Sequence, residues 1–125
     1  MRSAQISAYQ TIDTTTADPA QLVLRLLDGA VRFLRQALRG LDRGDVAVFA
    51  QGQSRAHAVI AELRSALDHD RGGEIAANLD RLYDFMLRHL TVGLLQKDRT
   101  RLEGVATLLV TLREGFDGAA GARRT

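Results

Sequence analysis

Apolar residues recur every three or four positions in four stretches of the chain, the spacing that forms one face of an α-helix. The first stretch begins at Asp18-Pro19, where an aspartate can cap free backbone N–H groups and a proline suits the first helical position. Gly40 and Gly44 mark its end. Its apolar face is formed by Leu22, Val23, Leu26, Leu27, Ala30, Val31, Phe33, Leu34, Ala37, Leu38 and Leu41.

Two further helices are predicted next along the chain. Asp45 begins the second helix, and the run Arg71-Gly72-Gly73 breaks it. Glu74 then lies in the first turn of a third helix, where a negative charge is favourable. The apolar faces of these helices are formed by Val46, Phe49, Ala56, Val59, Ile60, Leu63 and Leu67, and by Ile75, Leu79, Leu82, Tyr83, Met86, Leu87 and Leu90.

A fourth helix begins near Asp98 or Thr100, and Thr100 with Glu103 fits a capping box. Its apolar face is formed by Leu102, Val105, Leu108, Leu109, Leu112 and Phe116. No segment alternates with the period of a strand, and the linkers are short, as between antiparallel neighbours. The sequence therefore predicts an all-α fold, an antiparallel four-helix bundle.

The same pattern divides the chain into three parts. Residues 1–17 are mostly polar and predict a mobile N-terminal arm, or one extra helical turn. Residues 18–118 form one bundle domain, a size that suits a single hydrophobic core. Glycines near the end of the last apolar stretch predict a disordered tail over residues 119–125.

Composition narrows the classes of function. The chain has 125 residues and a net charge of only +2, and all of its basic residues except Lys97 are arginines scattered along the sequence. This is a weak footprint for nucleic acid, so we expect no nucleic-acid partner. There is no cysteine and no apolar run long enough to span a membrane. We see no secretory signal and expect a cytoplasmic protein that does not insert into membranes.

Candidate catalytic chemistry is sparse. None of His57, His69 and His89 has a second ligand four residues away, as a helical zinc site needs. The run Asp68-His69-Asp70 is interpreted as a solvated helix terminus, since adjacent helical residues point to different faces. No Glu-x-x-His pair is present for a di-iron bundle. We therefore predict no enzymatic activity, no metal and no cofactor.

The first helix carries more apolar surface than one core stripe requires. Either this helix is central and touches several others, or an apolar groove is left over for an amphipathic partner helix. The sequence pattern alone leaves both interpretations open.

Motifs along almost the whole chain are similar to those of one family. They read Ile6-Ser-Ala-Tyr9-Gln10, Asp18-Pro19-Ala-Gln-Leu22, Leu26-Leu27-Asp28-Gly29-Ala30-Val31-Arg32-Phe33-Leu34, Gly44-Asp45, Gly72-Gly73-Glu74-Ile75-Ala76-Ala77-Asn78-Leu79, Leu82-Tyr83-Asp84-Phe85-Met86 and Glu103-Gly-Val105 with Leu108-Leu109. Any one of them is weak, but their order and spacing over residues 6–117 resemble the FliS family of flagellin export chaperones.

The resemblance implies a chaperone that binds the disordered C-terminal segment of flagellin in the cytoplasm. It would prevent premature polymerisation and aid export through the flagellar type III secretion system, with export-gate or regulatory proteins as further partners. The N-terminal arm would occupy the flagellin groove of the free protein, and Gly29 would let another helix approach closely. The alternative is a homodimeric helical protein with a regulatory or scaffold role.

The resemblance also implies where flagellin would bind. The residues expected to line the groove are Ile6, Tyr9, Leu22, Leu26, Ala30, Leu79, Tyr83 and Leu90.

Overall fold

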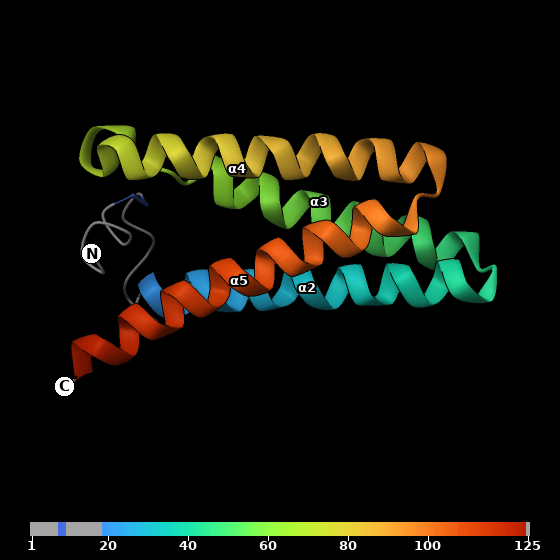
Figure 1. Ribbon diagram of the computed structural model, residues 1–125, viewed down its shortest axis with the longest axis horizontal. Coiled ribbons are helices and arrows are strands. Elements are labelled where there is room, and N and C mark those ends of the chain that lie inside the picture. Colours follow the sequence, from blue (N-terminus) through green and yellow to red (C-terminus); the bar gives the residue numbers. More distant parts are fainter. Residues whose placement is uncertain (1–7, 10–18, 125) are drawn as a thin grey trace.

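The computed structural model describes residues 8–9 and 19–124, with side chains described up to Phe116. Its four helices are α2 (Pro19–Arg43), α3 (Val46–Ser65), α4 (His69–Gln96) and α5 (Arg99–Arg124). Consecutive helices run in opposite directions (Figure 1). The contacts form a ring in which α2 touches α3 and α5, and α4 touches the same two helices. The predicted all-α, antiparallel four-helix bundle is confirmed.

Aspartate caps set the starts of α3 and α5. Asp45 caps α3, since its side chain accepts a hydrogen bond from the Val48 backbone N–H at 3.1 Å. Gly44, just before it, has a φ of +73°, a conformation that glycine adopts without strain. At the start of α5, Asp98 rather than Thr100 accepts a backbone N–H, that of Arg101. The predicted cap Asp18 lies outside the described residues.

The boundary between α3 and α4 differs from the prediction. The second helix ends at Ser65 rather than near Arg71, because Asp68 accepts hydrogen bonds from the Asp70 and Arg71 backbone N–H groups and starts α4 there. Gly73 has a φ of +50° and kinks α4 without ending it. The Asp68-His69-Asp70 run is thus the start of a helix.

The last helix is longer than the pattern indicates. It continues past Gly118 and Gly121 to Arg124, where the sequence predicts a polar tail. A glycine costs a helix only about 1 kcal/mol relative to alanine, and the intervening alanines are the strongest helix formers. The division into arm, bundle domain and tail stays a prediction.

The closest approach in the bundle joins α2 and α3. A Cβ built on Gly52 would stand 2.6 Å from the Phe33 carbonyl oxygen and 2.7 Å from the Ala37 backbone nitrogen. Gly40 of α2 is just as tightly placed against the backbone of Phe49. The two helices therefore meet backbone to backbone, and the core builds outward from this pair.

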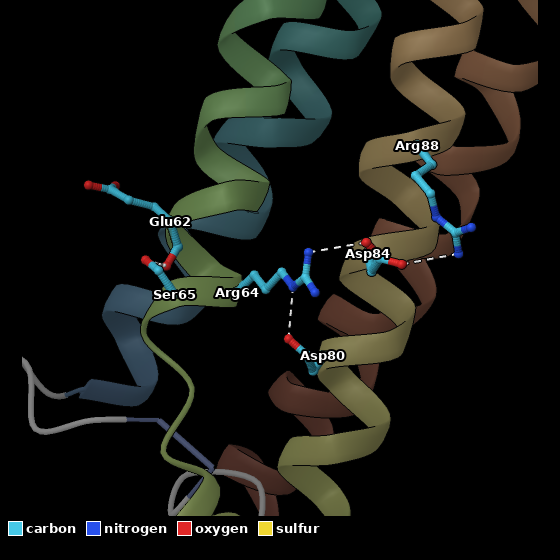
Figure 2. Close-up of polar contacts among 6 residues, drawn as sticks. All are labelled: Glu62, Arg64, Ser65, Asp80, Asp84 and Arg88. Atoms are coloured by element: carbon cyan, nitrogen blue, oxygen red, sulfur yellow. Dashed lines mark hydrogen bonds and ion pairs between the residues drawn. The ribbon is translucent and has the colours of Figure 1, made fainter.

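Polar contacts fix how the other helices align. Gln53, almost fully buried in α3, donates to the Leu90 carbonyl of α4 at 2.8 Å. Nearer the end of α3, Arg64 reaches both Asp80 and Asp84 of α4 (Figure 2). The Arg64 guanidinium holds the pKa of Asp80 below its usual range, chiefly through their hydrogen bond. Half-exposed ion pairs such as those of Arg64 add little stability, so they mainly set the register of α3 on α4.

We predict that Gly52→Ala destabilises the protein by about 1–3 kcal/mol, since the added methyl group must push two backbones apart. Urea unfolding measures this change. The matched control is Gly104→Ala, where a Cβ meets nothing within 4 Å and the higher helix propensity of alanine should add about 0.5–1 kcal/mol. Equal effects of the two substitutions would contradict the close approach of α2 and α3.

Candidate functional site

Two residues ahead of the bundle are part of its core. Ala8 is fully buried and Tyr9 is 5% exposed, at the end of the bundle where α4 and α5 diverge (Figure 1). Tyr9 forms an isolated antiparallel bridge with Leu67, and the Asp68 backbone N–H donates to the Ala8 carbonyl. The Ala8-Tyr9 pair is thus docked on the connection between α3 and α4.

Gly72 makes room for this docking. A Cβ at Gly72 would stand 2.7 Å from the Ala8 Cα atom, closer than real side chains approach. The adjacent Gly73 has open space where its Cβ would be and instead supplies the positive φ of the kink. Gly72 therefore permits the close approach of Ala8, whereas Gly73 permits the change in chain direction.

Tyr9 reaches the interior of the bundle through its hydroxyl. The Tyr9 and Tyr83 hydroxyls form a short hydrogen bond between buried side chains. Burial raises the pKa of Tyr83 to about 12, although the bond from Tyr9 works against this shift. Burial also raises the pKa of Tyr9, and the neighbouring Tyr83 raises it further. Both phenols are therefore neutral near neutral pH, and each satisfies the other's polar group.

The Tyr9 ring also contacts the end of α5. Its centroid lies 6.0 Å from that of Phe116, with the rings tilted by 58°. Pro19, Ala20 and Val23 of α2 complete the lining of a narrow apolar crevice around the two rings. One arm residue thus fills the space between α2, α4 and α5.

An apolar line beyond the core follows the junction of α4 and α5. We call it the α4/α5 strip; its members are Ile75, Leu82, Phe85 and His89 of α4 with Leu108 and Leu112 of α5. Spacings of seven, three and four residues place the α4 members on one side of that helix. Phe85 is 41% exposed and Ile75 is 36% exposed. The three leucines are half-buried against the core.

His89 ties the strip to α5. Its ring stacks on Phe85 with centroids 4.5 Å apart, and its Nδ1 atom lies 3.2 Å from the Arg101 guanidinium. Arg101 is in turn held by Asp98 at 3.2 Å. Phe85 and His89 are therefore fixed in place, so these side chains would lose less conformational entropy when a partner binds them.

The described side chains give no sign of a metal centre. Within residues 8–9 and 19–116, no three His, Asp or Glu side chains gather closely enough to hold an ion. None of the helices, over the residues that the structure describes, is both long and apolar enough to cross a bilayer.

Comparison with known proteins identifies the family. The family model of the flagellar protein FliS matches residues 1–123. The chain belongs to the FliS family. It is 36% identical to the flagellar secretion chaperone FliSB of Pseudomonas aeruginosa over 82% of this chain and 81% of that protein. It is 38% identical to the flagellar secretion chaperone FliS of Salmonella typhimurium over 90% of this chain and 83% of that protein.

Similarity extends to a more distant relative. The flagellar secretion chaperone FliS of Vibrio cholerae is 30% identical over 90% of this chain and 85% of that protein. The resemblance seen in the sequence motifs is therefore confirmed, and the bundle described above is that of a FliS family member.

The structure brings together only some of the groove residues that the FliS resemblance implies. Tyr9 contacts Tyr83, and Leu79 lies one turn before Tyr83 on the same side of α4. Leu22 and Leu26 are half-buried on a different part of the surface, the edge of α2 that adjoins α3. A single groove containing all five is therefore not what the free protein presents.

The other implied groove residues are placed differently again. Ala30 and Leu90 have no exposed surface and belong to the core. Ile6 lies outside the described residues. Whether any of these residues contacts flagellin stays a prediction, and Ala30 and Leu90 could do so only if neighbouring helices moved.

Sequence reasoning missed the α4/α5 strip and the role of Gly72. A signal for the strip was present, because Ile75, Leu82 and Phe85 form a line that the core face of α4 does not need. The contact between Gly72 and Ala8 had no such signal, since it joins segments far apart in the sequence.

We predict that the two tyrosines ionise only when Tyr9 leaves its place against Tyr83. The chain has two tyrosines and no tryptophan, so phenolate absorbance reports on Tyr9 and Tyr83 alone. Because burial raises their pKa values above the ordinary 10.0, it stabilises the folded state fully below about pH 10. This stability is lost as the pH rises toward about 12. Spectrophotometric titration of the folded protein should show phenolate appearing well above pH 10.

The same titration in concentrated urea supplies the control, where both tyrosines should ionise near their ordinary pKa of about 10. A folded protein that gains phenolate near pH 10 would show that the Tyr9–Tyr83 pair is not buried.

We also predict that Gly72→Ala releases Ala8, because the added Cβ would overlap the Ala8 backbone. The Asp68 amide then loses its acceptor, and its hydrogen exchange should speed up by about tenfold or more. Amide-resolved exchange measures this rate. Gly104→Ala should leave the Asp68 amide unchanged, and equal protection in both variants would contradict the docking.

Proposed function

We propose that this protein is a flagellar secretion chaperone that binds the C-terminal segment of flagellin in the cytoplasm. Binding prevents premature polymerisation and delivers the subunit for export through the flagellar type III secretion system. The observation that carries the proposal is the α4/α5 strip, an exposed apolar line on a FliS family bundle. The related proteins named flagellar secretion chaperones support it.

The geometry of the strip suits an amphipathic helix. Its α4 members span residues 75–89, about 21 Å or four turns of helix. A flagellin helix with apolar residues at positions i, i+3, i+4 and i+7 can lay one face along such a line. Binding buries surface that the free client segment exposes, so it removes the face through which flagellin subunits would assemble.

A disordered segment that folds on binding needs a large interface, because ordering its backbone costs free energy. The strip alone is narrow, so we infer that flagellin also uses the end of the bundle where Ala8-Tyr9 is docked. Displacing Tyr9 would open the crevice lined by Pro19, Ala20, Val23 and Phe116. The docked pair thus acts as a competing occupant of part of the flagellin site.

This function needs no covalent chemistry, in line with the expectation of a protein that is neither an enzyme nor a cofactor carrier. The bound segment is held by burial and released by dissociation. Export-gate or regulatory proteins are further partners in this proposal. The homodimeric scaffold is the competing proposal, and it would use the same exposed strip.

The test is binding of a peptide from the C-terminal end of flagellin, measured by isothermal titration calorimetry and circular dichroism. The wild-type protein should bind about one peptide with a gain in helicity. We predict that Phe85→Ala weakens binding by about tenfold, since it removes the most exposed aromatic of the strip. Its melting temperature should change little, because the ring is partly exposed in the free protein.

The matched control is Leu95→Ala, also on α4 and 78% exposed but outside the strip, which should alter affinity by less than about twofold. If the peptide gains no helicity at saturation, the chaperone proposal is wrong. A tight dimer that ignores the peptide and dissociates on Phe85→Ala would favour the homodimeric scaffold.

A further inference from the structure

The outward side of α2 carries a line of arginines. Arg25, Arg32, Arg39 and Arg43 follow one another at spacings of seven, seven and four residues, and Arg35 lies beside them. All five are exposed. From Arg25 to Arg43 this arginine line is about 27 Å long. The folded helix therefore gathers charges that look scattered in the sequence.

The acidic residues of α2 do not neutralise this line. Asp28 pairs with Arg113 of α5 at 2.8 Å, and Asp42 pairs with Arg99 of α5 at 2.6 Å. Among the described residues, no carboxylate forms an ion pair with any of the five arginines. The net charge of the whole chain is only +2, so the positive charge is concentrated on this side.

An apolar edge runs beside the arginine line, toward α3. It is formed by Leu22, Leu26 and Phe33, all half-buried. The guanidinium of Arg55, from α3, lies 5.8 Å from the Phe33 ring centroid in a cation–π contact. The edge is thus bordered by positive charge on both sides.

Gly29 lies between the arginine line and this edge, and the fold of the chain does not account for it. Sequence analysis expected it to admit a neighbouring helix, but a Cβ there would meet only the end of the Arg32 side chain, at 3.7 Å. A glycine within a helix costs about 1 kcal/mol relative to alanine. Gly29 is itself buried, beneath the end of the Arg32 side chain, so a partner backbone would reach it only after that side chain had moved.

We propose that this α2 face, the arginine line with Leu22, Leu26, Phe33 and Gly29, docks an acidic amphipathic helix of a partner protein. Guanidinium groups pair with carboxylates through two parallel hydrogen bonds, and a line of them matches a helix with acids on one side. The apolar edge beside the arginine line favours a protein helix over a nucleic acid, because phosphates would leave Leu22, Leu26 and Phe33 uncovered.

This site is separate from the one proposed for flagellin. The ring order of the helices places the α2/α3 edge diagonally across the bundle from the α4/α5 strip. An acidic partner on the arginine line therefore leaves the α4/α5 strip open, although Leu22 adjoins the Pro19, Ala20 and Val23 crevice that flagellin is proposed to use. The inference does not depend on the identity of the segment that occupies the strip.

The test uses a synthetic helical probe of about 20 residues, with glutamates along one side and leucines beside them, and a scrambled peptide of equal composition. Binding is followed by fluorescence anisotropy. The wild-type chain should bind the probe at least about tenfold more tightly than the scrambled peptide. The variant Arg25→Gln/Arg32→Gln/Arg39→Gln should lose at least about tenfold in affinity for the probe.

The matched control is Arg71→Gln/Arg81→Gln/Arg88→Gln, which removes the same charge from exposed positions on α4 and should change probe affinity by less than about twofold. The variant Gly29→Ala separates docking from stability. It should raise the melting temperature by about 2–5 °C, because alanine is the better helix former, and should lower the affinity for the probe. A merely structural glycine would not give changes of opposite sign.

Three results would overturn the proposal. The first is equal binding of probe and scrambled peptide. The second is tighter binding of phosphatidylglycerol vesicles or of a single-stranded oligonucleotide than of the probe, which would make the face a general polyanion site. The third is a loss of flagellin-peptide binding in the α2 triple variant, which would assign the face to the flagellin site. Failure of flagellin-peptide binding in the wild-type chain, with probe binding intact, would leave this inference standing.

Discussion

The close contact between the backbones of α2 and α3 is the constraint on which the rest of the bundle depends. Gly52 lets α3 approach the Phe33–Ala37 stretch of α2 to within contact of its main chain. Among the described glycines, only Gly40 and Gly52 meet the backbone of another helix this closely, and both lie between α2 and α3. The helices α4 and α5 then cover this pair from the other side. α5 follows α2, to which Arg113 ties it at Asp28, whereas α4 follows α3 through Gln53 and Arg64. The two covering helices consequently diverge toward one end (Figure 1).

That divergence explains the burial of Tyr9. Where two helices diverge, apolar side chains between them lose neighbours, and an empty interior space would cost van der Waals contacts. Tyr9 fills the space against Phe116 and gives the Tyr83 hydroxyl its hydrogen-bond partner. Tyr9 is held only by the contacts of Ala8 and by burial of its own ring, so we expect it to leave without unfolding the helices. A flagellin segment that replaces it must also satisfy the Tyr83 hydroxyl or admit water to it.

The sequence predicted what depends on neighbours within a helix and failed where distant segments meet. Helical periodicity, with Pro19 at the first position of α2 and the cap at Asp45, sufficed for the all-α bundle. The predicted break at Gly72-Gly73 does coincide with non-helical backbone at Gly73, but the sequence missed the turn before it, which Asp68 caps as the start of α4. Periodicity alone placed Tyr9 in a mobile arm, because its partners Tyr83 and Phe116 are far away in the sequence and no local pattern reports such contacts. Only the FliS resemblance implied that the arm docks on the bundle.

The same reasoning applies to charge. Arginines seven residues apart look evenly scattered in a linear sequence, but the helix aligns them, and α5 withdraws the two aspartates that would have balanced them. The whole chain is nearly neutral, so its electrostatic field comes mainly from the arginine line on α2. Salt screens this field beyond about one Debye length, near 8–10 Å, so the field would orient the proposed acidic partner only at close range. Orientation at that range favours approach to α2 and leaves the α4/α5 strip facing away. A nearly neutral bundle can thus keep two binding events apart by geometry alone, with no change of conformation linking them.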